Sequence, residues 1–374
     1  MKIVHIITGL GDGGAENVLF KICKYDIKNK HYIISLKGPG KYFSLIKKLG
    51  VTVYCLNMRF YSLNKFFYLV KLLKRLKPNI VQTWLVHADF LGSIAARLAG
   101  INKILWNVRY SNIKLGKAKF TTIIVIRLLS ILSYIIPKCI VTVSKKAKKI
   151  YQLAGYNKKI FKFIPNGYDF SILKVNNQKK INFKKKIKIK KNIPIIGKVA
   201  RYDPQKDHFN LLNALFLIKS KNINFFCVLI GSNINNNNFE LISEIKRLDL
   251  SKCIKLLGQT ENIQQVMNGI DIHVLSSSYG EGFPNVVAES MACGTPSIVT
   301  DVGDSSLIVG STGWVVPPND SIKLANAIKK AINERTTVNW NKRCNKARLR
   351  IKRNYSISKM INLYNKAWSS VYAK

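Results

Sequence analysis

Short apolar segments alternate with longer amphipathic stretches along most of the 374-residue chain. The apolar segments have the length of strands, and the stretches between them have the length and periodicity of helices. This alternation is typical of βαβ units, in which parallel strands form one sheet and helices cover it. We expect strands at residues 3–7, 32–36, 51–56, 80–83, 103–107 and 139–143, and again at 194–199, 225–230, 254–257, 272–275 and 297–299.

The alternation stops once, after Asn166-Gly167, where a polar and Lys-rich stretch replaces the apolar segments. A new series of strands follows, so the pattern predicts an α/β fold of two doubly wound, Rossmann-like domains. The basic C-terminus has a helical pattern from about Trp340 to Val371 that could pack back towards the N-terminal domain. The expected organisation is an N-terminal domain at 1–172, a basic linker region at 173–191, a C-terminal domain at 192–338 and a C-terminal helical segment at 339–374.

The chain carries 62 Lys and Arg against 18 Asp and Glu, a formal net charge of +44. Because 47% of its residues are hydrophobic, a disordered basic tail is excluded. One explanation of the charge is attraction to an anionic partner, such as nucleic acid, a phosphate-bearing substrate or an anionic membrane. The other is A/T-rich codon usage, since Lys, Asn and Ile are all abundant.

The seven cysteines occur singly, without the paired spacing of zinc sites or disulfide frameworks. The N-terminal apolar segment ends at Gly9 and is too short for the core of a signal peptide. Both features lead us to expect a reducing, cytosolic location.

Residues 120–137 form an apolar run of nearly membrane-spanning length, with Arg127 near its middle. A charge at that depth in a bilayer costs about 2.5–3.5 kcal/mol, which argues against a spanning helix. A core helix is one interpretation. The other is a helix lying in a membrane surface, because residues 65–77 also mix cations with large apolar side chains.

The first expected strand leads into a glycine-rich loop that contains Gly13 and Gly14 and satisfies the G-x-G-x-x-G pattern. Such a loop brings backbone N–H groups and a helix N-terminus close to a phosphate. A dinucleotide site would also need an acidic residue at the end of the second strand, but that strand ends at Leu36-Lys37. The loop therefore indicates phosphate binding and gives an NAD-dependent dehydrogenase little support.

Arg201 and Lys206 lie five residues apart in the loop that follows the strand at 194–199. Two cations at this spacing can converge on one diphosphate, Arg through forked hydrogen bonds and Lys as a point charge. They could stabilise a leaving group. With this many lysines in the chain, Lys206 could also be an ordinary surface cation.

Glu281 and Glu289 lie eight positions apart, the first before Gly-Phe-Pro and the second within an apolar helix. This spacing is too wide for an acid–base pair on one helical turn, so we assign them to different subsites. A carboxylate among apolar neighbours needs hydrogen-bond donors, and the hydroxyl groups of a sugar would supply them.

At these residues the chain resembles the retaining GT-B glycosyltransferases of the large group-1 family, of the bacterial surface-polysaccharide type. Their E-x7-E motif corresponds to Glu281 and Glu289. Asp304 stands where many relatives have a second glycine, a departure that bears on the identity of the sugar. The resemblance extends over nearly the whole chain and also rests on residues 13–16, 83–89, 164–167, 201–206, 257–258 and 293–296.

The resemblance implies two domains facing across a cleft, with the acceptor on the N-terminal side. It assigns catalytic roles to Glu281, His87, Arg201 and Lys206, with Arg201 and Lys206 on the diphosphate. Glu289 would hold the ribose, Gly258 and Ile263 would lie near the base, and Gly13 and Gly14 near the phosphates. The donor-binding set is Gly13, Gly14, Arg201, Lys206, Gly258, Ile263, Glu281, Gly282, Phe283, Pro284, Asn285 and Glu289.

The expected function is transfer of a hexose or N-acetylhexosamine from a nucleotide sugar, most simply a UDP-sugar. The acceptor would be a polyprenyl-diphosphate-linked glycan or a polysaccharide. We expect no cofactor, no metal requirement and no nucleic-acid partner, and we expect peripheral binding to the anionic inner face of the cytoplasmic membrane. A nucleotide-sugar epimerase of the same fold, an NAD-dependent dehydrogenase and a nucleic-acid-binding module are the alternatives.

Overall fold

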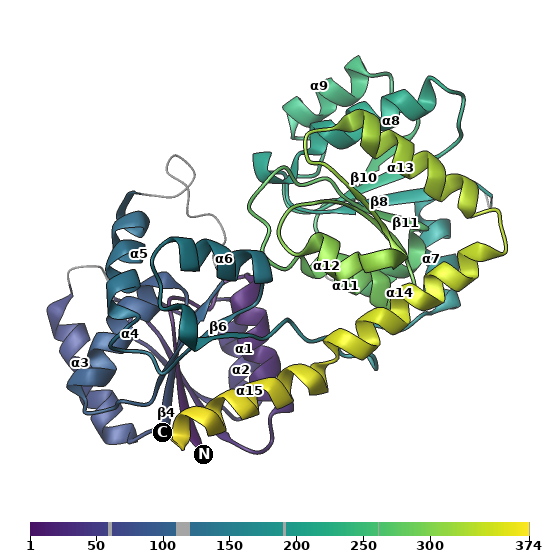
Figure 1. Ribbon diagram of the computed structural model, residues 1–374. Coiled ribbons are helices and arrows are strands. Elements are labelled where there is room, and N and C mark those ends of the chain that lie inside the picture. The colour runs from purple at the N-terminus through teal and green to yellow at the C-terminus, as the bar shows by residue number, and fades with distance from the viewer. Residues whose placement is uncertain (59–61, 110–119, 190–191, 261, 374) are drawn as a thin grey trace. The chain divides into compact units, whose positions relative to one another are not determined.

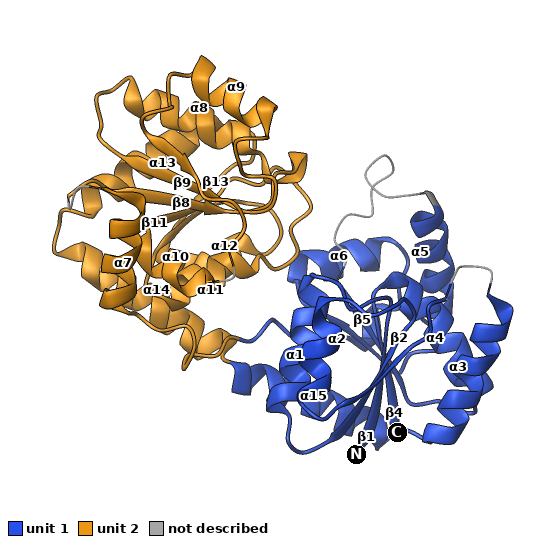
Figure 2. Cartoon of the chain, turned by 180° about the vertical axis from the view of Figure 1, so that it is seen from behind, with its two compact units in different colours: residues 1–167, 357–374 blue, residues 168–356 orange. Residues whose placement is uncertain are grey.

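The computed structural model describes residues 1–58, 62–109, 120–189, 192–260 and 262–373. The chain forms two compact units, one of Met1–Gly167 with Ile357–Lys374 and one of Tyr168–Ser356 (Figure 2). We call them the first and the second unit. Each unit contains its own parallel sheet with helices on both faces, which confirms the predicted fold class of two Rossmann-like units.

The first unit is built on a seven-stranded parallel sheet in the order β3-β2-β1-β4-β5-β6-β7. The register places Lys2 of β1 opposite Lys30 of β2, and Ile3 of β1 opposite Ile80 of β4. The strands are β1 (Lys2–Ile7), β2 (Lys30–Ser35), β3 (Thr52–Cys55), β4 (Ile80–Trp84), β5 (Ile104–Val108), β6 (Cys139–Thr142) and β7 (Phe161–Phe163).

Helices cover both faces of this first sheet (Figure 1). On one face, α3, α4 and α5 share a buried apolar core with the strands. On the other face, α1, α2 and α15 form a second core with them. The helices of the first unit are α1 (Gly14–Tyr25), α2 (Lys41–Lys47), α3 (Leu63–Leu76), α4 (Val86–Leu98), α5 (Phe120–Leu132), α6 (Lys145–Leu153) and α15 (Ile357–Tyr372).

The second unit has a six-stranded parallel sheet in the order β10-β9-β8-β11-β12-β13. Its strands are β8 (Ile195–Val199), β9 (Phe226–Ile230), β10 (Ile254–Leu256), β11 (Ile272–Leu275), β12 (Ser297–Thr300) and β13 (Trp314–Val316). Its helices are α7 (Asn177–Ile187), α8 (His208–Lys219), α9 (Phe239–Arg247), α10 (Ile263–Gly269), α11 (Asn285–Ala292), α12 (Ser305–Val309), α13 (Ser321–Glu334) and α14 (Asn339–Tyr355).

The eleven expected strands are all present, and the two that the sequence did not indicate are β7 and β13. Both have three residues and lie at an edge of a sheet. β10 is equally short and also lies at an edge, but it was expected.

The region 173–191, expected as a basic linker, contains α7. This helix belongs to the second unit, and its side chains Phe183 and Ile187 are buried. The helical pattern from Trp340 to Val371 is divided between α14 and α15. Between them Ser356 is extended (φ −68°, ψ 151°) and pairs with Tyr168, so the chain enters and leaves the second unit at neighbouring positions.

The apolar run at 120–137 forms α5 and the turn after it. One side of α5 is buried, with Val125, Ile126 and Leu129 in the core, and the other side is exposed. The core-helix interpretation is therefore correct for only one side of α5. Within the described ranges, no helix is both long and apolar enough to cross a membrane.

Candidate functional site

The main cluster of predicted site residues lies at the carboxyl ends of the strands in the second sheet. Lys206 follows β8, and Glu281 follows the neighbouring strand β11. The strand order reverses between β8 and β11, since β9 and β10 lie on one side and β12 and β13 on the other. Ligands of open α/β sheets bind at such a switch point, outside the carboxyl ends of the strands.

Lys206 and Glu281 form an ion pair, with 2.6 Å between Nζ and Oε1. Ser277 donates a hydrogen bond of 2.6 Å to the same carboxylate oxygen. The side chains of Lys206 and Glu281 are only 16% and 8% exposed. Removing two charges from water is costly. The stability of an ion pair with so little solvent exposure therefore depends on its geometry and on further hydrogen bonds.

The loop that carries Lys206 is fixed by its own residues and by the segment after β11. Asp203 accepts a hydrogen bond from Gln205 N at 2.9 Å and so caps the short turn at Pro204–Lys206. Ser276 Oγ donates to Asp207 O at 2.7 Å, and Ser278 N donates to Gln205 O at 3.0 Å. The two loops are thereby held together beneath the ion pair.

Lys198 is a buried residue of this region that the sequence did not single out. Its ammonium group donates to Lys206 O at 2.5 Å and to Ser276 Oγ. Burial, with the charge of Lys206 as the next cause, lowers the pKa of Lys198 to about 7. A lysine inside the apolar strand β8 was the available signal, but the abundance of lysine elsewhere hid it.

Arg201 has a different partner from Lys206. Its Nη2 lies 3.0 Å from Asp203 Oδ2, and its side chain is 54% exposed. The structure therefore brings Lys206 and Glu281 together, while Arg201 extends into solvent beside Asp203.

The segment from Glu281 to Asn285 passes from β11 into α11. Phe283 is buried, with its ring centroid 5.2 Å from that of Tyr355. Asn285 Oδ1 accepts a hydrogen bond of 2.7 Å from Tyr168 OH. These contacts fix the backbone at Gly282 and Pro284, the two remaining residues of the predicted set here.

Glu289 lies in α11 and is partly exposed, contrary to full burial among apolar neighbours. Gly258 follows β10 and has a φ of +66°. Its N–H donates a hydrogen bond to Ile234 O, and its carbonyl accepts one from Gly231 N. Ile263 is the first residue of α10. Gly258 and Ile263 follow the edge strand β10, which β9 separates from β8.

The loop after β12 packs against the backbone of the site. Asp304 N donates to Gly282 O at 2.8 Å. Gly303 has a φ of +59°, and a Cβ on it would lie 2.4 Å from Glu281 O. Only glycine fits this position without displacing the backbone of Glu281.

In the first unit, Gly13 caps α1 and Gly14 is its first residue. A Cβ on Gly13 would lie 2.4 Å from Glu16 Oε2, so the carboxylate of Glu16 folds back over this helix end. Burial raises the pKa of Glu16, and the nearby charge of Arg109 opposes that rise. The expected phosphate cradle thus already contains an acidic group.

His87 lies in the first turn of α4, after β4, and is half-buried. Burial, with Lys37 as a second cause, lowers its pKa, so its imidazole is neutral at pH 7. Leu85, two residues earlier, has a φ of +73°, which is strained for a branched side chain. Thr83 Oγ1 donates to the buried Asp89 at 2.6 Å and fixes the start of α4.

Arg109 follows β5 and is a second residue that the sequence did not indicate. Its guanidinium donates to Asn107 Oδ1 at 3.1 Å, Asn166 Oδ1 at 2.9 Å and Tyr364 OH at 3.1 Å. It also lies 5.2 Å from the ring of Trp84. A positioned cation therefore lies at the carboxyl edge of the first sheet, the edge that carries His87.

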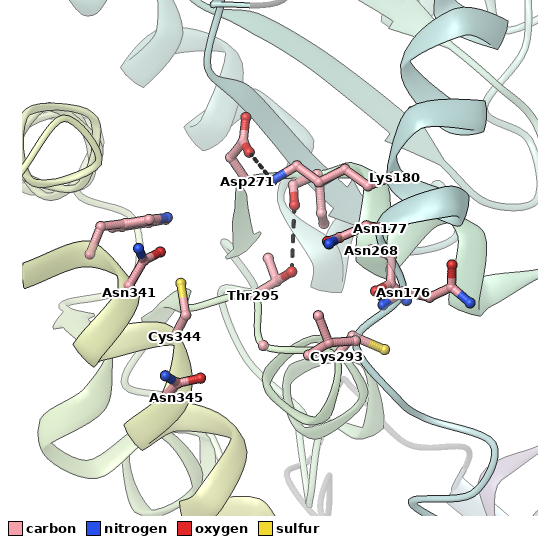
Figure 3. A pocket seen from close by; sticks show the side chains of 14 residues that line it. Asn176, Asn177, Lys180, Asn268, Asp271, Cys293, Thr295, Asn341, Cys344 and Asn345 are labelled. Atoms are coloured by element: carbon pink, nitrogen blue, oxygen red, sulfur yellow. Dashed lines mark hydrogen bonds and ion pairs between the residues drawn. The ribbon is translucent and has the colours of Figure 1, made fainter. Parts of the chain in front are cut away.

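A cavity of about 410 Å³ in the second unit contains none of the predicted site residues (Figure 3). It lies at the amino ends of the strands, where Lys180 Nζ is 3.1 Å from Asp271 Oδ1. Asp271 precedes β11 and accepts a hydrogen bond from Ile195 N, the first residue of β8. The cavity and the Lys206–Glu281 pair therefore lie at opposite edges of one sheet.

No group of three or more His, Cys, Asp or Glu side chains is arranged to hold a metal ion among the residues that the structure describes. The polar groups at the switch point include the ammonium groups of Lys198 and Lys206, the carboxylate of Glu281 and the hydroxyl of Ser277.

Two Rossmann-like units with parallel sheets make up the GT-B architecture. A structure of Anabaena Alr3699/HepE in complex with UDP has this fold, with a TM-score of 0.87 and 20% identity. The alignment covers 99% of this chain and 100% of that one. A glycosyltransferase of Rickettsia africae gives a TM-score of 0.84 at 21% identity, covering 99% of this chain and 98% of that one.

Sequence comparison identifies the family. Residues 179–352 match the glycosyl transferases of group 1, and residues 12–171 match glycosyltransferase family 4. Residues 179–352, nearly all of the second unit, belong to the group 1 glycosyltransferases.

Two curated relatives have more specific names. CapM of Staphylococcus aureus, a capsular polysaccharide biosynthesis glycosyltransferase, is 27% identical over 294 residues, 76% of each chain. The UDP-Gal:alpha-D-GlcNAc-diphosphoundecaprenol alpha-1,3-galactosyltransferase of Escherichia coli is 25% identical over 286 residues, 74% of this chain and 72% of that one. The comparisons give no support to an epimerase, a dehydrogenase or a nucleic-acid-binding module.

Proposed function

We propose that this glycosyltransferase moves a hexose or N-acetylhexosamine from a UDP-sugar to a lipid-diphosphate-linked glycan or a polysaccharide, with retention of configuration and without a metal ion. The reaction would serve the synthesis of a cell-surface glycan. The observation that carries the proposal is the buried Lys206–Glu281 pair at the switch point of the second sheet.

Lys206 would bind the diphosphate of the donor. Departure of a nucleoside diphosphate concentrates negative charge on its phosphates, and a fixed ammonium group in a poorly hydrated site stabilises that charge. Lys198 would act as a positioning residue, because it holds the carbonyl of Lys206. Arg201 would supply a second charge after exchanging Asp203 for phosphate, a change that its exposure permits.

Glu281 would accept hydrogen bonds from the transferred sugar once Lys206 turns to the phosphates. The backbone of Gly282 and Phe283 would line the same subsite, with Pro284 and Asn285 at the start of α11. Glu289 would accept hydrogen bonds from the ribose hydroxyls. Gly258 and Ile263 would border the base, and Gly13 and Gly14 would bind phosphate oxygens.

His87 would act beside the reacting sugar on the acceptor side. Its lowered pKa keeps it neutral, so it can accept a hydrogen bond from a sugar hydroxyl. No residue is assigned as a covalent nucleophile, since the resemblance implies departure and attack on the same face of the sugar.

Names of relatives support the substrates. The Escherichia coli relative uses UDP-Gal, acts on a diphosphoundecaprenol-linked sugar and forms an alpha-1,3 linkage. Because UDP-galactose carries its sugar in the α configuration, an α product means retention. A lipid-linked acceptor also supports peripheral association with the anionic inner face of the cytoplasmic membrane.

The test is incubation of the purified enzyme with UDP-linked hexoses and N-acetylhexosamines, a lipid-diphosphate-linked sugar and excess EDTA. We expect transfer from at least one donor, with an α-linked product by NMR and no loss of rate with EDTA. A β-linked product would contradict retention, and a strict requirement for added manganese or magnesium would contradict metal independence. Conversion of the donor without any acceptor would identify an epimerase instead.

A further inference from the structure

Helix α5 presents a row of large apolar side chains to solvent. Ile124, Leu128 and Ile131 are spaced four and three residues apart, which places them on one face of the helix. Ile135 continues the row in the turn that follows. Ile131 and Ile135 are 66% and 62% exposed, and Tyr134 beside them is 65% exposed.

The opposite face of α5 is apolar as well and is buried in the core of the first unit. A helix that is apolar on all sides, as α5 is apart from the exposed Arg127, is normally enclosed by protein or lipid. Here the protein encloses only one side. A continuous row of exposed apolar side chains indicates an interaction surface, whereas single exposed apolar residues do not.

Helix α3 belongs to the same layer as α5, with α4 between them (Figure 1). Its exposed side begins with Leu63, Phe67 and Tyr68. The same side ends with cations, namely Lys71, Lys74, Arg75 and Lys77. We call the exposed sides of α3 and α5 the outer face of the layer.

The net charge of the chain is distributed unevenly between the two units. The first unit has 33 Lys and Arg against 4 Asp and Glu, a net +29, and the second has 29 against 14, a net +15. The cations are nearly evenly divided, as codon usage would predict. The acids are not, and between Asp26 and Asp169 the sequence has only the buried Asp89. Codon usage acts on both units alike, so it does not explain why acidic residues are rare in the first unit only.

We propose that the outer face binds an anionic lipid bilayer, with the row Ile124, Leu128, Ile131 and Ile135 inserted among the lipid headgroups. Exposed apolar side chains and cations on neighbouring helices are the two components of interfacial binding. Each cation near an anionic leaflet is attracted to its surface. The charge that attracts the bilayer also opposes the alternative occupant, a second copy of this chain, because two such faces would repel each other.

The location of the surface suits a lipid-linked acceptor, and in this respect the inference rests on the proposed function. In a parallel βαβ unit, helices begin at the edge where strands end. The first two turns of α3 and α5, which hold Leu63, Phe67 and Ile124, therefore lie towards the carboxyl edge of the first sheet. His87 and Arg109 lie at that edge.

The test is flotation of the full-length protein with vesicles of phosphatidylcholine, with and without phosphatidylglycerol. We expect binding that requires phosphatidylglycerol and weakens with salt. The double variant Leu128→Ser/Ile131→Ser should bind at least about tenfold more weakly, because it loses inserted apolar surface. Neutralising Lys71, Lys74, Arg75 and Lys77 to Gln should also weaken binding at least about tenfold.

Two matched control variants have the same chemical changes on exposed residues of the second unit. Ile181→Ser/Ile322→Ser removes the same kind of apolar side chain, and neutralising Lys185, Lys186, Lys329 and Lys330 removes the same charge. Both should bind vesicles like the wild type. Equal binding by the wild type and the α5 variant would overturn the proposal.

Sedimentation velocity tests the alternative occupant. We expect a monomer at all concentrations, and a self-association that Leu128→Ser/Ile131→Ser abolishes would overturn the membrane assignment. Donor turnover with a water-soluble acceptor should be the same in the wild type and the α5 variant. Vesicle binding needs no catalysis, so a failed transfer assay and a failed flotation assay contradict different proposals.

Discussion

Lys206 and Glu281 neutralise each other at 2.6 Å in a region that water barely reaches. Under the proposed function, an incoming diphosphate would offer the ammonium group a partner of higher charge. Glu281 would then keep its hydrogen bond from Ser277 and could accept another from a sugar hydroxyl. The ion pair avoids leaving either charge without a partner in a poorly hydrated region.

Replacing Lys206 by Ala should lower turnover by about 100–1,000-fold, the range seen when one stabilising donor is removed. Steady-state kinetics with the active donor would measure it. Lys219→Ala is the matched control, because Lys219 pairs with the 90% exposed Asp249 on the surface of the same unit. Equal turnover in the two variants would mean that the diphosphate is bound elsewhere.

Lys198 should make stability depend on pH. The pKa of this lysine is lowered from its ordinary 10.5 to about 7. Between these pH values the lysine is protonated in the unfolded chain and neutral in the folded chain, so folding must release a proton. This cost to stability decreases as the pH rises. The contribution of Lys198 to the free energy of unfolding therefore rises from about pH 7 to about pH 10.

The variant Lys198→Met lacks this titration, and comparing it with the wild type cancels the titration of other groups. Urea denaturation at several pH values should show the stability of the wild type rising relative to that of the variant as pH increases. A difference that stays constant with pH would show that Lys198 titrates alike in both states.

At the scale of elements, the loop after β12 supports the site through Gly303. Gly303→Ala should cost more than the roughly 1–2 kcal/mol of a left-handed residue, because its Cβ would also displace Glu281 O. Gly100→Ala is the control, since Gly100 has a φ of +82° and nothing within 4 Å of its Cβ position. Chemical denaturation should rank the two variants in that order, and only Gly303→Ala should raise the KM for the donor. Equal effects would mean that the contact with Glu281 is unimportant.

Most elements could be predicted from the sequence because each long strand is an apolar run between turn residues. β7 and β13 were missed, although β10, an edge strand of the same length, was predicted. The division between α14 and α15 was also hidden. Ser356 is compatible with a helix locally, and it is extended because it pairs with Tyr168.

Lys206 and Glu281 could be singled out from the sequence because each stands in a motif, but the ion pair between them, 75 positions apart, was not predicted. Lys198 was missed because lysine is abundant elsewhere in the chain, and Arg109 was missed because its contacts depend on residues far along the chain. Arg109 contacts Tyr364, which lies 255 positions away. The pairing of Arg201 with Asp203 was missed as well, although the two are neighbours in sequence, because the diphosphate was the only partner considered.

For the whole molecule, a net charge of +44 implies self-repulsion in the folded state. Salt screens this repulsion over about 10 Å at 0.1 M ionic strength. We therefore expect the melting temperature to rise as sodium chloride is raised from about 0.02 M to about 0.3 M. Differential scanning fluorimetry would measure it, and a falling melting temperature would indicate that attractive ion pairs dominate.

The central claim is that the carboxyl edge of the second sheet binds the nucleoside diphosphate of the donor. Calorimetric titration of UDP into the full-length wild type, Lys206→Met and the control Lys219→Met tests it directly. Charge-assisted hydrogen bonds contribute about 1.5–3 kcal/mol, so Lys206→Met should bind UDP at least about tenfold more weakly, while the control matches the wild type. Equal affinity in all three proteins, or no binding of UDP by the wild type, would contradict the account.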